Sequence, residues 1–260
     1  MLSEKMITER PPLQQPSNHL EITYYTDPLC CWSWAFEPQW RRFVYEFQDI
    51  IRYRYCMAGL LPSWEKYHDE ANNVSRPIQM GPVWMHAQQL SGMPIQHTIW
   101  MKDAPASSYP ACMAVKAVEL QSIKLGERYL RMLREAVMIQ GRNIAKRHVL
   151  VEVAVEMGKL YKDFDTTLFE KDLQSDTALE SFKKDVYETR QLNIVRFPSL
   201  VVKNAHNQAI LLSAHSNYES LLESLRKITT IPNQRKKIDP QAYKNFWHEL
   251  TEKEAQQIIY

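Results

Sequence analysis

The start of the chain restricts the possible folds most, because it reads as a strand, a helix and a second strand. The run EITYY (21–25) is rich in β-branched and aromatic residues and stops at Asp27. Apolar side chains between residues 32 and 47 recur at the three- to four-residue spacing of a helix. Residues 50–57 then alternate between apolar and polar or small side chains, as a half-buried strand does. This stretch therefore predicts a β-α-β unit.

Strand character returns only late in the chain. The runs SLVVK (199–203) and AILLS (209–213) flank a turn that contains Asn204 and Asn207, which indicates a hairpin. A helix over 217–228 is expected to follow it.

Between these two groups of strands the sequence predicts helices only. We expect five of them, located at 82–92, from Ser107 or Ser108 onward, around 129–137, around 149–157 after an Asn143 cap, and from Ser175 onward. The chain is therefore expected to be α/β, with a mixed sheet and a large all-helical insertion, residues 63–194, between the two halves of that sheet.

Composition excludes several classes of function. Of the 260 residues 45% are hydrophobic and 24% are charged, as in ordinary globular proteins. The net charge of +2 does not favour nucleic acid or an anionic membrane surface. No apolar run is long enough to span a membrane. The six glycines form no phosphate-binding loop, and the eight histidines show no metal-ligand spacing. We therefore expect no nucleic-acid, membrane or metal partner and no tightly bound cofactor.

The two ends of the chain differ from its middle. Residues 1–19 are polar and contain prolines, which predicts a loose N-terminal arm without the apolar segment of a secretory signal. Residues 229–260 are charged and interrupted by prolines, and are expected to be a C-terminal tail with a short helical piece. The globular domain is expected over 20–228. Four cysteines in a chain of this length do not make a disulfide scaffold, which favours a reducing, cytoplasmic location.

The residues that point to chemistry lie where the first strand meets the first helix. Cys30 occupies this junction, and a helix N-terminus presents unpaired N–H groups and a partial positive charge. Both favour the thiolate, which is the reactive form of cysteine. Ser33 lies three residues further on, a spacing that lets its hydroxyl face Cys30. The site is thus expected to carry one thiol and one hydroxyl.

The remaining cysteines are expected to play other parts. In a helix Cys31 points about 100° away from Cys30. A disulfide between these neighbours is disfavoured, because adjacent Cα atoms are only about 3.8 Å apart. Cys56 ends the second strand and Cys112 lies on an apolar helix face, so both are expected to be buried and unpaired, whereas Cys30 is expected to be partly exposed.

Two motifs give the chain a family resemblance. The segment DPLCCWSW (27–34) resembles the Asp-Pro-x-Cys-x-Trp-Cys-Trp motif of the FrnE-like branch of the DsbA family, in the thioredoxin superfamily. FPSLVV (197–202) resembles the cis-proline segment of that family, and residues 103–121 and 129–144 resemble its helical insertion. The likeness extends to the SpxH-type adaptors, which share the fold and bind a transcription factor for proteolysis.

The resemblance implies a thioredoxin-like, DsbA-like fold and a set of site residues. Cys30 would be the nucleophile. The Phe197–Pro198 bond would be cis, and the Phe197 backbone would lie against the thiol and pair with a substrate chain. Cys31, Trp32 and Trp34 would line the same substrate site. The departure from the family motif is Ser33, which stands where the resolving cysteine is expected.

Two hypotheses about function follow. The first is an enzyme, a protein-disulfide oxidoreductase or isomerase that uses Cys30 alone and forms mixed disulfides with protein or small-molecule thiols. Glutathione would serve as co-substrate, and a chemistry like that of kappa-type glutathione transferases is a variant of this idea. The second is a non-catalytic adaptor that binds a protein partner. Ser33 favours the adaptor, while Cys30, both tryptophans and the Phe197–Pro198 segment favour the enzyme, to which the sequence leans.

Overall fold

The computed structural model describes residues 19–213, 217–230 and 236–256. All but the last residue of the predicted N-terminal arm, 1–19, therefore lies outside the described residues.

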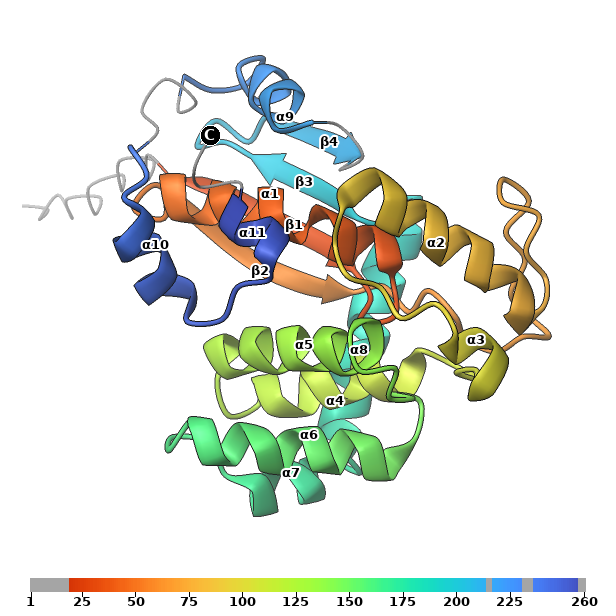
Figure 1. Cartoon of the computed structure of the whole chain (residues 1–260). Helices are drawn as coiled ribbons and strands as arrows, with labels where there is room; N and C mark the ends of the chain where they lie inside the picture. The colour runs from red at the N-terminus through yellow and green to blue at the C-terminus, as the bar shows by residue number, and fades with distance from the viewer. Residues whose placement is uncertain (1–18, 214–216, 231–235, 257–260) are drawn as a thin grey trace, which may run out of the picture.

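A mixed sheet of four strands forms the centre of the protein (Figure 1). Its strands are β1 (Leu20–Thr26), β2 (Ile51–Met57), β3 (Ser199–Lys203) and β4 (Ala209–Ser213), arranged in the order β2-β1-β3-β4. β1 runs parallel to β2 and antiparallel to β3, and β3 forms the predicted hairpin with β4. Tyr25 pairs with Ser199, so the residues just before β3 lie beside the end of β1.

Helices surround this sheet and confirm the α/β prediction. They are α1 (Cys31–Phe47), the 3₁₀ turn η1 (Pro77–Gln79), α2 (Met80–Ser91), α3 (Ile99–Lys102), α4 (Tyr109–Glu119), α5 (Ile123–Met138), α6 (Arg147–Leu160), α7 (Thr166–Asp172), α8 (Asp176–Gln191), α9 (Tyr218–Leu225), α10 (Pro240–Trp247) and α11 (Glu252–Gln256). In Figure 1, α4 to α7 form a separate group beside the β2 edge of the sheet, and α9 lies at the β4 edge. Between β2 and β3 the chain adds η1 and helices α2 to α8 but no further strand of the sheet, as predicted.

Local signals explain most helix boundaries. The predicted cap Ser175 accepts the Ala178 N–H, and Gly92 ends α2 with a positive φ of 71°. The prediction that Asn143 caps α6 is wrong: Lys146 is the N-cap, and the Asn143 side chain instead accepts the Ala145 N–H. The short helices α3 and α7 were not predicted, because segments this short show little periodicity.

The C-terminal segment is more ordered than predicted. Its residues 236–256 form α10 and α11, and α11 contacts α1. Figure 1 shows α11 directly in front of α1. Tyr243 of α10 is buried and stacks edge-on against Tyr45 of α1. This part of the predicted tail therefore packs on the body of the protein.

Candidate functional site

Cys30 lies between β1 and α1, as predicted. The chain turns at Asp27, whose carbonyl accepts the Cys30 N–H at 3.1 Å. Cys30 has extended backbone angles (φ −78°, ψ 107°) and is the N-cap of α1. Its Sγ accepts the Ser33 backbone N–H at 3.4 Å. The thiol thus satisfies one of the unpaired N–H groups at the start of the helix.

The prediction that Cys30 is partly exposed is wrong. Only 4% of the residue is accessible to solvent. Burial raises the pKa of the Cys30 thiol, because a charged sulfur would lose its hydration. Hydrogen bonds from Ser33 lower this pKa, the carboxylate of Asp27 raises it further, and the charge of Arg134 lowers it. Burial outweighs the favourable position at the helix start, on which the expectation of an easily ionised thiol depended.

Ser33 faces Cys30 as predicted, but it also belongs to a larger polar arrangement. Its side chain is fully buried, and its hydroxyl accepts a hydrogen bond from Thr26 Oγ1 at 2.8 Å. Thr26 Oγ1 in turn accepts Nη2 of Arg134 at 2.5 Å. The Ser33 hydroxyl and backbone N–H both lower the pKa of Cys30. Ser33 therefore joins the thiol to a buried arginine on α5.

Two of the residues predicted to contact substrate lie in the core instead. Cys31 is 3% exposed and packs in the main apolar cluster. Trp34 is 0% exposed, donates its indole N–H to the Pro94 carbonyl at 2.9 Å, and carries the guanidinium of Arg131 over its ring. Trp32 is half-buried and meets the His86 ring edge-on. Only Trp32 of these three has surface that a ligand could contact.

The Phe197–Pro198 peptide bond is cis, as predicted. The Cys30 thiol lies against this segment and donates to the Phe197 carbonyl at 3.7 Å. Phe197 is half-buried and packs against Tyr25 and Cys56. The structure thus brings residues 30 and 197 together from opposite ends of the sequence, at the end of β1.

Asp27 is a site residue whose role the sequence reasoning missed. It is 0% exposed, and its carboxylate accepts the backbone N–H groups of Leu29 at 2.8 Å and Leu60 at 2.6 Å. The same carboxylate accepts the hydroxyl of Ser108 at 2.6 Å and the thiol of Cys112 at 3.3 Å. Asp27 therefore ties the turn before Cys30 to the loop after β2 and to the start of α4. Two signals were present in the sequence: Asp27 is a charged residue directly after a buried strand, and it is the first residue of the DPLCCWSW segment.

The predictions for the other two cysteines are confirmed. Cys56 and Cys112 are 0% exposed and unpaired. Burial raises the pKa of both thiols, that of Cys56 to about 12. All four cysteines are free, so no vicinal disulfide joins Cys30 to Cys31.

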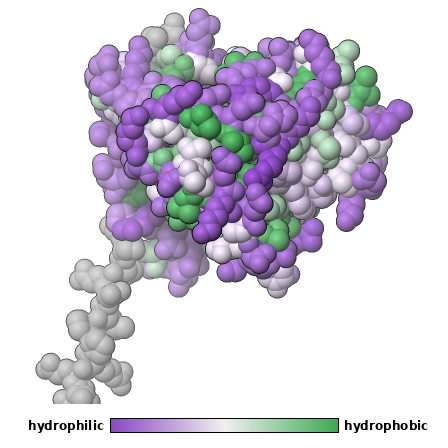
Figure 2. Space-filling view, turned by 90° about the horizontal axis from the view of Figure 1, so that it is seen from below, coloured by the Kyte–Doolittle hydropathy of each residue, from purple (hydrophilic) through white to green (hydrophobic). Residues whose placement is uncertain are grey.

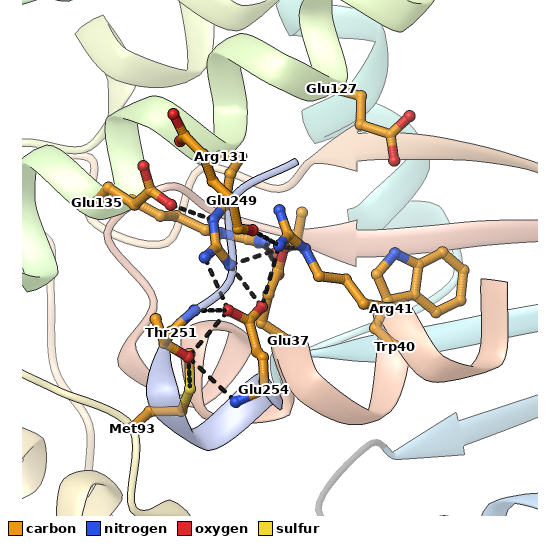
Figure 3. Close-up of polar contacts among 12 residues, drawn as sticks. Glu37, Trp40, Arg41, Met93, Glu127, Arg131, Glu135, Glu249, Thr251 and Glu254 are labelled. Carbon is orange, nitrogen blue, oxygen red and sulfur yellow. Dashed lines mark hydrogen bonds and ion pairs between the residues drawn. The ribbon is translucent and has the colours of Figure 1, made fainter. Parts of the chain in front are cut away.

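A buried cluster of charged side chains lies between α1, α5 and α11 (Figure 3). Glu254 of α11 receives both Nη atoms of Arg131, at 2.8 and 2.9 Å, and lies 3.3 Å from Nη1 of Arg41. Glu37 lies 2.7 Å from Arg134 Nη1, 3.4 Å from Arg41 Nε and 3.6 Å from Arg131 Nη1. The cluster therefore connects the C-terminal helix to α1 and α5.

A cavity of about 500 Å³ opens beside this cluster. Glu127 lies in its wall and accepts the hydroxyls of Tyr53 at 2.8 Å and Tyr55 at 3.3 Å. Burial raises the pKa of the Glu127 carboxyl. Cys30 does not line the cavity, which is therefore separate from the thiol site.

Exposed apolar side chains occur near the Phe197 segment and on the helices that follow β2. Val195, two residues before Phe197, is 77% exposed. Others lie on η1, α2 and α3: Ile78, Met85, Leu90 and Met101. On the face shown in Figure 2, hydrophobic side chains form small groups separated by hydrophilic ones.

The described part of the chain contains neither a cluster suited to a metal ion nor a helix suited to span a membrane. No group of three His, Cys, Asp or Glu side chains there could hold a metal ion. None of the described helices combines the length and the apolar character that a membrane-spanning segment needs.

Comparison with known proteins gives both a family and a fold. The family model described as thioredoxin matches residues 24–223. ClpXP adapter protein SpxH of Shouchella clausii is 32% identical over 219 residues, which cover 82% of this chain and 68% of that protein. SpxH of Halalkalibacterium halodurans is 29% identical over 214 residues, with the same coverage of each chain.

Two of the similar solved structures are described as disulfide-exchange proteins. A putative protein disulfide isomerase from Nitrosomonas europaea has a TM-score of 0.66 at 20% identity, covering 80% of this chain and 97% of that one. The cytosolic disulfide reductase DsbM from Pseudomonas aeruginosa has a TM-score of 0.61 at 20% identity, covering 80% and 100%. At this identity the likeness establishes the fold alone. The family match over residues 24–223 and the 32% identity to SpxH show that the chain belongs to the thioredoxin family and has the SpxH adapter proteins among its relatives.

Proposed function

We propose that the protein is an adaptor of the SpxH type, a thioredoxin-fold module that binds a protein client and presents it to the ClpXP protease. The observation that carries this proposal is the state of the thiol site. Its one nucleophile, Cys30, is 4% exposed, and the position of the second thiol holds Ser33, which is fully buried. Dithiol exchange needs an accessible thiolate and a second thiol to release the substrate, and this site offers neither.

Similarity to curated proteins supports the same proposal. The SpxH relatives match 82% of the chain, and they are adapters by description. The redox proteins match in fold at 20% identity. A fold shared with enzymes does not carry their activity, because function depends on the site.

The adaptor proposal is tested by degradation of a client. We expect the purified protein to accelerate, at least about tenfold, the degradation by ClpXP of the transcription factor that SpxH-type adaptors bind. Cys30→Ser should accelerate degradation equally, because binding does not require the thiol. Loss of acceleration in Cys30→Ser, or no acceleration by the parent, would contradict the proposal.

The surface beside the cis-proline segment is the expected client site. Val195 is 77% exposed there, two residues before the Phe197 backbone that the family resemblance pairs with a bound chain. Val195→Asp is expected to weaken client binding about tenfold or more, as measured by calorimetry. Leu160→Asp is the matched control, since Leu160 is 56% exposed on α6, outside this segment. Equal losses in both variants would place the client elsewhere.

A second candidate function, thiol chemistry at Cys30 alone, is favoured by one contact. The Cys30 sulfur lies 3.7 Å from the Phe197 carbonyl beside cis-Pro198, where the family resemblance places a bound substrate chain. A thiolate there would attack glutathione disulfide, form a Cys30–glutathione mixed disulfide and release one glutathione thiolate. Mass spectrometry of the intact protein after incubation with glutathione disulfide tests this step directly.

Ser33→Cys separates the two candidates further. We expect this variant to form an intramolecular disulfide with Cys30, because a thiol would replace a hydroxyl that already faces the Cys30 sulfur. It should then reduce a protein disulfide at least about tenfold faster than the parent. A Cys31→Ala background excludes exchange with the neighbouring thiol, and Ser33→Ala is the control without a second thiol. A Ser33→Cys protein that stays fully reduced in oxidised glutathione would contradict this expectation.

A further inference from the structure

A series of buried hydrogen bonds leads from Arg134 to Cys30. Arg134 Nη2 donates to Thr26 Oγ1 at 2.5 Å, and Thr26 Oγ1 donates to Ser33 Oγ at 2.8 Å. Ser33 then donates its backbone N–H to the Cys30 sulfur at 3.4 Å, and its hydroxyl is one of the groups that lower the pKa of this thiol. Arg134 is 1% exposed, and Thr26 and Ser33 are 0% exposed. Water therefore does not compete for these bonds.

The direction of each bond follows from the chemistry of the first donor. A guanidinium donates hydrogen bonds and never accepts them, so Thr26 Oγ1 must accept from Arg134. The single hydroxyl proton of Thr26 is then left for Ser33 Oγ. Because Ser33 Oγ accepts that proton, its own proton is free to point at the next acceptor. A thiolate is a stronger acceptor than the neighbouring phenol of Tyr24, which carries its own proton.

We propose that Arg134 and Thr26 are positioning residues that fix the Ser33 hydroxyl as a proton donor toward the Cys30 sulfur and so stabilise its thiolate. Ser33 then acts as a hydrogen-bond donor in the thiol site and does not simply occupy the position of the second cysteine. This inference goes beyond the adaptor function, because it concerns the ionisation of Cys30 whether or not the thiol takes part in client binding.

The charges around the thiol make this donor important. Titratable groups that face Cys30 come from β1, from α1, from the loop after β2 and from α5: Tyr24, Asp27, Cys31, Tyr67 and Arg134. Arg134 is the one cation among them, while burial and the Asp27 carboxylate both oppose ionisation. A donor held in place by that cation is therefore the main local support for a thiolate.

The test measures ionisation of Cys30 without requiring reagent access. The full chain is labelled with ¹³Cβ-cysteine, the Cys30 signal is assigned by its loss in Cys30→Ser, and its chemical shift is followed against pH. Thr26→Val removes the hydroxyl but keeps the shape, and should lower the thiolate fraction at a given pH about tenfold, as expected for loss of a hydrogen bond to a charged group. Ser33→Ala should do the same.

Controls separate this role from a structural one. Thr26→Ser keeps the hydroxyl and should titrate like the parent. Arg134→Met is not used, because it would leave the buried carboxylate of Glu37 without its partner Arg134. The test therefore uses the Thr26 variants, and thermal unfolding checks that they are folded. Superimposable titration curves for Thr26→Val, Thr26→Ser and the parent would overturn the proposal. So would a Cys30 signal that does not titrate below the pH of unfolding. If the adaptor function is wrong, the protein will not accelerate degradation by ClpXP, but the Cys30 titration curves of the Thr26 variants will be unaffected.

Discussion

Glu254→Gln is expected to lower the free energy of unfolding by about 3–5 kcal/mol, the usual cost of removing one partner from a buried ion pair. Glu254 is 0% exposed and lies between Arg131 and Arg41. A glutamine would leave both guanidiniums buried with one anion fewer. Urea unfolding followed by tryptophan fluorescence measures the change. Glu252→Gln is the matched control, because Glu252 is exposed on the same helix.

The same carboxylate gives a pH dependence with a defined sign. Burial acts against ionisation of Glu254, but Arg41 and Arg131 outweigh it, and the pKa of the carboxyl is lowered. The unfolded chain therefore binds a proton at a higher pH than the folded protein. The stabilisation is present above the ordinary carboxylate pKa and is lost as the pH falls through the folded value. We expect the difference in stability between parent and Glu254→Gln to shrink in acid, and a constant difference would contradict the ion-pair explanation.

Asp27→Ala is expected to lower the free energy of unfolding by at least about 3 kcal/mol, because each buried donor left without an acceptor costs about 1–3 kcal/mol. The backbone N–H groups of Leu29 and Leu60 and the hydroxyl of Ser108 would all lose their acceptor. Urea unfolding again measures the loss. Asp165→Ala is the control, since Asp165 is an exposed N-cap on α7 whose removal should cost about 1 kcal/mol.

Asp27→Ala should also change the thiol site. The turn between Asp27 and Cys30 is fixed by this carboxylate to the loop after β2 and to the start of α4. Without it we expect Cys30 to become accessible, and its alkylation by iodoacetamide at a fixed pH to rise about tenfold or more. If Asp27→Ala costs no more than Asp165→Ala and leaves alkylation unchanged, Asp27 does not hold this turn.

Much of the fold could be predicted because its signals are local. Two strand-like runs flanking a turn at Asn204 and Asn207 marked the β3–β4 hairpin, and the Ser175 cap marked the start of α8. The junction that holds Cys30 follows from a strand, a turn and a helix that are contiguous in sequence. The cis Phe197–Pro198 bond was expected from the family resemblance alone.

The rest depends on contacts between distant residues. Cys30 is buried because the Phe197 segment lies against it, 167 positions later in the chain. From the sequence alone, Glu254 is one of several charged residues in a polar tail. Its role could not be predicted, because its partner Arg131 lies 123 positions away. Trp34 was assigned to a substrate site, but Arg131 and Pro94, from elsewhere in the chain, enclose it in the core.

The docking of α11 has a consequence for biosynthesis. Arg41 and Arg131 are translated long before Glu254, the carboxylate that α11 contributes to their cluster. On the ribosome these two arginines therefore face an incomplete cluster until α11 has emerged, because distant contacts form only when both segments are available. A nascent chain that stops before α11 leaves this charged surface uncovered and open to chaperones and proteases. The stability of the folded protein therefore depends on synthesis having passed α11.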